Sequence, residues 1–223
     1  LSNAHLICRV NQRGELISVK RLEIDREYIS GVGNRFLMFK DVNTCYDAWE
    51  IGSMYEKMPV KLDKKPEIYA EDHPWSAVLT IKKQLHDSVL EQSVILNPDE
   101  DRLIFANTIQ WNEKHKMLKL KWAFDIENPH AYYEVPFSVI ERPCDGEEEP
   151  GLTWFGVKGD NAGFAICNSD TYSGSVKDGT LYHTVLRSPI YGDHGGPRSD
   201  ESDYTEQGVR EFRYAVVPFN ENS

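Results

Sequence analysis

Apolar and polar residues alternate along most of the chain, which is the pattern of β-strands with one buried face. In the clearest run, between residues 118 and 124, every second residue is large and apolar and most residues between them are lysine. A preceding run carries four residues on one face: Leu103, Phe105, Ile109 and Trp111. Both runs predict half-buried strands.

Turn-forming residues separate these runs. The segment 11–14 predicts a hairpin turn between strands 5–10 and 15–21, and the segment 112–115 predicts another between the two runs above. A third turn is expected at 97–101. Further short strands are predicted at 131–135, 138–141, 153–157, 163–168, 180–187 and 211–218.

Three segments interrupt the strand rhythm, at 41–65, 143–151 and 188–207, and long loops in a compact β domain are usually functional or mobile. Helical periodicity does not extend over three turns anywhere. The pattern therefore predicts an all-β sandwich of large antiparallel sheets with little helix. The chain is treated as one unit, with the option that the first ~75 residues belong to a different sheet.

The charge of the chain excludes several classes of partner. Lys and Arg number 25 against 36 Asp and Glu, which gives a formal net charge of −11. A surface of this charge repels phosphate backbones and anionic lipids, so neither nucleic acid nor a membrane is an expected partner. Apolar runs also stay short of the roughly 18 residues needed to span a bilayer.

The four cysteines, Cys8, Cys45, Cys144 and Cys167, form no CxxC pair and have no histidine at zinc-finger spacing. Such scattered thiols favour a reducing cytoplasm over a disulfide scaffold. Residues 1–4 include Ser-Asn-Ala, which is typical of a cloning scar. We therefore expect a fragment, with one domain at 5–219 and a tail at 220–223.

Nucleophile and metal motifs are weak. Cys167 falls in an apolar strand and is interpreted as an inert core thiol, whereas Cys45 is a marginally better reactive candidate. The loop around Asp193 could supply metal ligands with His194 and Asp200, but a flexible polar loop explains the same residues. Nothing local marks a pair of catalytic carboxylates.

The segment 46–50 combines aromatic rings with carboxylates, through Tyr46, Asp47 and Trp49. A ring face stacks on the C–H groups of a sugar, while an acid accepts hydrogen bonds from its hydroxyl groups. This composition predicts sugar contact, although packing against another domain explains an exposed tryptophan equally well.

Several ordered motifs together resemble the C-terminal region of family 38 glycoside hydrolases, the α-mannosidases. They are 46–51 (YDAWEI), 121–126 (KWAFDI), 131–137 (AYYEVPF), 141–143 (ERP), 163–168 (GFAICN), 186–189 (LRSP) and 211–218 (EFRYAVVP). The resemblance covers almost the whole chain, from about residue 5 to residue 219, and its specificity lies in the order of the set.

The resemblance implies a galactose-mutarotase-like β-supersandwich from a retaining α-mannosidase. Zinc and the catalytic residues are then expected in an N-terminal catalytic domain absent from this chain, so no cofactor is expected here. This chain would pack on that domain and be inactive alone. By position, Tyr46, Asp47, Trp49, Arg187 and Asp193 are the expected substrate-binding residues, at the rim of an α-mannoside pocket.

Two other functions stay open, together with the oligomeric state. One is a free-standing carbohydrate-binding module, which needs an open groove lined by rings. The other is a mutarotase-like sugar epimerase, for which His183, His194 and Glu211 are the best available set. A domain that packs on another should instead expose an apolar patch near Trp49 or Trp75.

Overall fold

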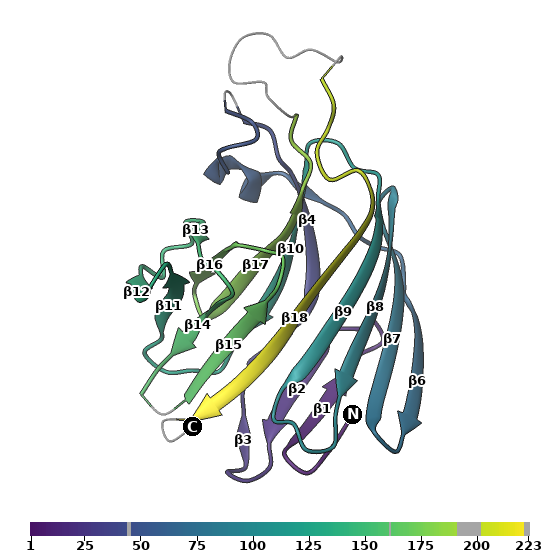
Figure 1. Ribbon diagram of the computed structural model, residues 1–223, viewed down its shortest axis with the longest axis vertical. Helices are drawn as coiled ribbons and strands as arrows, with labels where there is room; N and C mark the ends of the chain where they lie inside the picture. Colours follow the sequence, from purple (N-terminus) through teal and green to yellow (C-terminus); the bar gives the residue numbers. More distant parts are fainter. Residues whose placement is uncertain (44–45, 161, 191–201, 221–223) are drawn as a thin grey trace.

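The computed structural model describes residues 1–43, 46–160, 162–190 and 202–220. Within these ranges the chain is almost entirely β, as the alternating pattern predicts (Figure 1). The one helical element is a short 3-10 helix, η1 (Ser53–Lys57), in a segment predicted to be irregular. No helix in this described part is long and apolar enough to cross a membrane.

The larger of the two main sheets has nine antiparallel strands. In spatial order they are β12 (Ser138–Arg142), β11 (His130–Val135), β14 (Trp154–Lys158), β15 (Ala162–Asn168), β18 (Gly208–Asn220), β9 (Leu103–Trp111), β8 (Ser88–Leu96), β7 (Ser76–Leu85) and β6 (Glu67–His73). The long strand β18 runs through the middle of this sheet and pairs with β15 and β9.

The second main sheet has six strands. They are β13 (Glu149–Pro150), β16 (Ser173–Lys177), β17 (Thr180–Arg187), β10 (Lys116–Ala123), β4 (Arg35–Lys40) and β5 (Pro59–Val60). A small sheet of β1 (Leu6–Val10), β2 (Leu16–Arg21) and β3 (Arg26–Glu27) completes the fold. The strands of the first 75 residues are divided among all three sheets: β1–β3 form the small sheet, β4 and β5 join the six-stranded sheet, and β6 joins the nine-stranded one.

The two main sheets pack face to face through aromatic side chains. Trp122 of β10 contacts Phe105 of β9 and Phe164 of β15, each with ring centroids 5.5 Å apart, and all three are fully buried. Gly33 lies against the same indole, so closely that a Cβ there would come within 2.5 Å of the ring. The core therefore needs both the alternation of β10 and a residue without a side chain at position 33.

The predicted turns are confirmed, with one correction. Residues 11–14 join the antiparallel pair β1 and β2, and residues 97–102 join β8 and β9. Residues 112–115 do form a turn, but not a hairpin, because β9 belongs to the nine-stranded sheet and β10 to the six-stranded one. Alternation defines which face of a strand is buried, not which sheet the strand joins.

The three described cysteines, Cys8, Cys144 and Cys167, form no disulfide. Cys8 is buried, and desolvation raises the pKa of its thiol to about 12. The interpretation of Cys167 as a core thiol is wrong, because its side chain is on the exposed face of β15. Its apolar neighbours Phe164 and Ile166 fill the buried face instead. Cys45 lies outside the described residues.

One edge of the nine-stranded sheet is formed by β12, where no further strand pairs among the described residues. Three apolar side chains are exposed there: Phe137 in the turn before it, and Val139 and Ile140 on the strand. Charged Glu141 and Arg142 follow at its end. The edge therefore combines an unpaired backbone with apolar surface.

Candidate functional site

A groove of about 750 Å³ opens where the ends of several strands meet, and we call it the Trp49 groove. It is lined by residues 48, 49 and 51, by the segment 170–173, by the end of β17 and by the start of β18. These segments are far apart in sequence. Two predicted site residues, Trp49 and Arg187, therefore lie in one groove.

Exposed rings and charged groups share this groove. The Trp49 side chain is 70% exposed and its ring stacks on Tyr46, with centroids 6.0 Å apart and planes 12° from parallel. Tyr172, also more than half exposed, lines the same groove. Asp170 and Glu211 add carboxylates. The lining thus offers ring faces beside hydrogen-bond acceptors, the combination that suits a sugar.

Arg187 holds the Trp49 segment against β17. Its Nε donates to Asp41 Oδ2 at 2.8 Å, and one terminal nitrogen donates to the carbonyls of Asp47 and Glu50 at 3.1 and 2.6 Å. Asp41 is only 1% exposed. Burial raises the pKa of its carboxyl, although the Arg187 guanidinium opposes this effect. Such charge-assisted bonds fix a loop more firmly than neutral ones.

Asp47 is also a positioning residue in this structure. Its carboxylate is 2% exposed, accepts a hydrogen bond from the Ile190 backbone N–H at 2.9 Å and lies 3.4 Å from His115 Nδ1. Asp47 thus faces the interior and Trp49 faces the groove. Sugar contact by Tyr46, Asp47, Trp49 and Arg187 stays a prediction, and Asp193 lies outside the described residues.

Sequence reasoning did not single out Tyr172, Glu206 or Arg210, which also line the groove. Arg210 Nε pairs with Glu206 Oε2 at 2.8 Å, across the turn that leads into β18. The available signal was the position of these residues at strand ends beside long loops, where binding residues concentrate. Alternation alone could not bring the three segments together.

The epimerase set is not assembled in the structure. His183 is fully buried between the sheets, where its Nε2 contacts the Thr171 hydroxyl. Burial, with a further effect of Lys119, lowers its pKa to about 3. Glu211 is on the exposed face of β18, and His194 lies outside the described residues. A buried neutral imidazole cannot reach a sugar in the groove.

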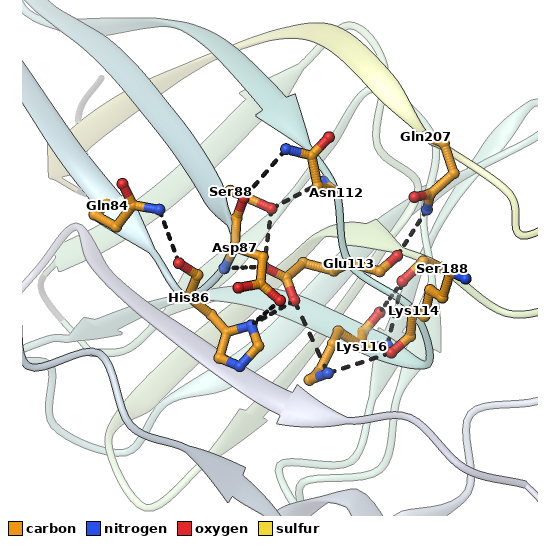
Figure 2. Close-up of polar contacts among 10 residues, drawn as sticks. All are labelled: Gln84, His86, Asp87, Ser88, Asn112, Glu113, Lys114, Lys116, Ser188 and Gln207. Carbon is orange, nitrogen blue, oxygen red and sulfur yellow. Dashed lines mark hydrogen bonds and ion pairs between the residues drawn. The ribbon is translucent and has the colours of Figure 1, made fainter.

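One cluster has residue types suited to a metal, formed by His86, Asp87 and Glu113, whose ligand atoms lie within 4.8 Å of one another. Figure 2 shows that these atoms already have protein partners. Glu113 accepts from the Asp87 N–H and the Ser88 hydroxyl at 2.8 and 2.9 Å, and its Oε2 lies 2.9 Å from His86 Nδ1.

The same carboxylate also has a nearby cation, Lys116, at 3.9 Å. Gln207 donates to the Glu113 carbonyl at 2.7 Å. The cluster therefore links the β7–β8 turn to the β9–β10 connection and to the segment before β18 (Figure 2). A buried carboxylate satisfied by these donors is a structural brace and does not fit a zinc site, which needs ligand lone pairs directed at the ion.

Comparison with solved structures defines the fold class. The chain superposes on a putative aldose 1-epimerase from Escherichia coli K12 with a TM-score of 0.57 and 10% identity, over 99% of this chain and 98% of that one. The predicted galactose-mutarotase-like supersandwich is therefore confirmed. A glycosyl hydrolase family 38 protein from Enterococcus faecalis gives a TM-score of 0.82 at 16% identity, over 99% of this chain and 30% of that chain.

The sequence match then gives the family. Residues 1–195 match the model of the glycosyl hydrolases family 38 C-terminal domain, and the chain belongs to this family. Alpha-mannosidase 2C1 from Mus musculus is 27% identical over 235 residues, which is 98% of this chain and 21% of the relative. The chain thus spans about a fifth of the length of the curated relatives that it matches.

Proposed function

We propose that this chain is the non-catalytic β domain of a retaining α-mannosidase, which braces a catalytic domain and lends the Trp49 groove to the rim of its sugar pocket. The observation that carries the proposal is the groove itself. It presents the exposed rings of Trp49 and Tyr172 beside carboxylates, on a segment that Arg187 fixes to β17. Zinc and the catalytic carboxylates belong to the other domain in this proposal.

Family membership and the length of the relatives support this division of labour. The relatives are α-mannosidases about five times as long as the match. Trp75 supports it too, because its ring is 69% exposed and stacks on His73. Two exposed tryptophans in one domain indicate surface available to another domain or ligand, as the sequence predicts.

A hydrolysis assay tests the absence of chemistry. The chain, mixed with an aryl α-mannoside with and without added zinc, should release no more aryl alcohol than buffer does. Turnover above that background would contradict the proposal, because it would require a complete pair of catalytic carboxylates within this chain.

A sugar titration tests the rim. Methyl α-mannoside should quench tryptophan fluorescence weakly and saturably, and Trp49→Ala should remove most of this response. Trp75→Ala is the matched control, because it removes an equally exposed indole outside the groove. Equal responses of the two variants would refute the rim role. Tight binding by the chain alone would favour a free-standing carbohydrate-binding module.

A further inference from the structure

A second pocket, of about 240 Å³, lies where β4 and the edge strand β5 of the six-stranded sheet approach β7 of the nine-stranded sheet. The β1–β2 turn and the segment 62–65 close its sides. It shares no lining residue with the Trp49 groove. We call it the Lys83 pocket.

Its charge is opposite to that of the molecule. Five cationic side chains line it, namely Arg13, Arg35, Lys64, Lys65 and Lys83, against two carboxylates, Glu15 and Asp63. The lining therefore has an excess of three positive charges in a chain of net charge −11. A local field of this sign concentrates anions.

Lys83 is the central group. Strand β7 buries every second residue, and Lys83 occupies the same face as the core residues Ile81 and Leu85, whereas Lys82 faces solvent. Lys83 is only 8% exposed. Within the described ranges its ammonium has no hydrogen bond and no ion pair, and it is not among the fully enclosed polar atoms, so it stays accessible from the pocket that it lines.

The Glu15 carboxylate favours the charged form of Lys83 but forms no ion pair with it. Glu15 receives both ends of the Arg35 guanidinium, at 2.7 and 3.0 Å, and also the Asn11 amide at 2.9 Å. Its hydrogen-bonding capacity is therefore directed at other donors. Desolvation lowers the pKa of Lys83; the Glu15 carboxylate opposes this effect, and Arg13 and Arg35 reinforce it. The net direction is downward, so the fold places the charged form of Lys83 at a disadvantage that an anion would relieve.

Size and lining define the class of ligand. A volume of about 240 Å³ holds roughly eight water molecules and is below the ~300 Å³ at which pockets for drug-sized ligands begin. Phe36, Met38 and Val60 contribute an apolar floor, where a charge interaction is stronger than in water. From the unpartnered ammonium, the cationic rim and this volume, we propose that the Lys83 pocket binds a small oxyanion, a phosphate or a carboxylate.

The chain offers a matched pair of variants for the test. Lys83→Met and Lys82→Met remove the same charge from adjacent positions of one strand, but only Lys83 lines the pocket. Arg13→Met is a third variant, at an exposed rim position where folding is not at risk. Calorimetry and thermal unfolding are measured with inorganic phosphate and with acetate, against chloride at equal ionic strength.

We expect saturable phosphate binding with a rise in Tm for wild type and for Lys82→Met. Lys83→Met should weaken binding about tenfold or more, the equivalent of losing one charge-assisted contact. Arg13→Met should give a smaller loss. Stronger binding of phosphate than acetate assigns the site to phosphate, and the reverse order assigns it to carboxylates.

Two results would overturn the proposal. One is the absence of saturable binding of either anion to wild type. The other is an equal loss in Lys82→Met and Lys83→Met, which would mean that anions respond only to overall charge. A sugar-binding result at Trp49 affects neither outcome, since the two sites share no lining residue.

Discussion

Two buried lysines in this domain are handled in opposite ways. On the outer face of the six-stranded sheet, Lys119 is 1% exposed and pairs with Glu148, while its ammonium also contacts the Tyr55 hydroxyl at 3.0 Å. In the pocket between β7 and β4, the Lys83 residue is 8% exposed but has no such partner among the described residues. The fold therefore supplies the counter-ion of Lys119 from its own residues, whereas the counter-ion of Lys83 has to come from a ligand.

The pKa values follow the same division. Burial opposes the charged form of Lys119, but the Glu148 carboxylate and Tyr55 outweigh it and raise the pKa. Glu148 is fixed in turn by the hydroxyls of Ser173 and Thr184. For Lys83 burial prevails and lowers the pKa. Lys119 therefore stabilises the fold, whereas the charged form of Lys83 destabilises it.

The largest expected change in stability comes from removing the ion pair between Lys119 and Glu148. Lys119→Met should lower the free energy of unfolding by about 3–5 kcal/mol, because it leaves the Glu148 carboxylate buried without its cation. Urea unfolding measures this change. Lys121→Met, two residues along β10, removes the same charge without this pair and is the control. A loss below about 1 kcal/mol would mean that Lys119 is not structural.

His183 extends the comparison to a base kept neutral by burial. Its folded pKa of about 3 lies below the ordinary value of 6.5, so the unfolded chain takes up a proton first as pH falls. Stability should therefore decrease from pH 6.5 toward pH 3, by up to about 1.4 kcal/mol per pH unit.

His183→Gln should flatten the slope of unfolding free energy against pH in this window. A slope identical to that of wild type would place His183 outside the groups that determine acid stability.

For Lys83, in contrast, we expect that removal of the charge stabilises the protein. In the absence of anions, Lys83→Met should raise the free energy of unfolding by about 1–3 kcal/mol, since an apolar side chain replaces an unpartnered polar one. Because the folded pKa of Lys83 is lowered, the wild-type deficit is present at neutral pH and disappears as pH rises to its unfolded value of 10.5.

Chemical denaturation of both proteins at neutral and alkaline pH tests this sign. The stability difference between Lys83→Met and wild type should shrink with rising pH. A destabilised Lys83→Met variant would show that the ammonium has a compensating partner within the fold.

The smallest expected effect belongs to Lys82. Its ion pair with Glu91, at 3.1 Å, is half exposed on both sides, and such surface pairs contribute little. Lys82→Met should unfold at the same urea concentration as wild type within experimental error. A clear shift of this urea concentration would indicate that a charge on either face of β7 affects stability. The difference between Lys83 and an ordinary surface lysine would then not hold.

Local patterning was sufficient to predict most strands. The prediction at 180–187 coincides with β17, and those at 131–135 and 163–168 differ from β11 and β15 by one residue at one end. The exposure of Trp49 and Trp75 was also expected from the family resemblance. These features depend on period-two alternation and on short motifs, which the sequence displays directly.

The remaining features depend on long-range placement. The crossing from β9 to β10 between sheets looks like a hairpin in sequence, because its turn is short and polar. The Trp49 groove needs four separate segments to meet. Lys83 could have been found, since it occurs in phase with the apolar residues Leu79, Ile81 and Leu85. A lysine at a position where the alternation predicts a buried apolar residue breaks the local pattern, and such exceptions often occur at functional sites.

The open side of β12 has a consequence for the behaviour of the chain in concentrated solution. An edge strand with free backbone groups and exposed Val139 and Ile140 is a template on which a second molecule can add a strand. The net charge of −11 acts against this growth, because like-charged molecules repel one another. Shelf life and working concentration should therefore depend on ionic strength, because salt screens this repulsion.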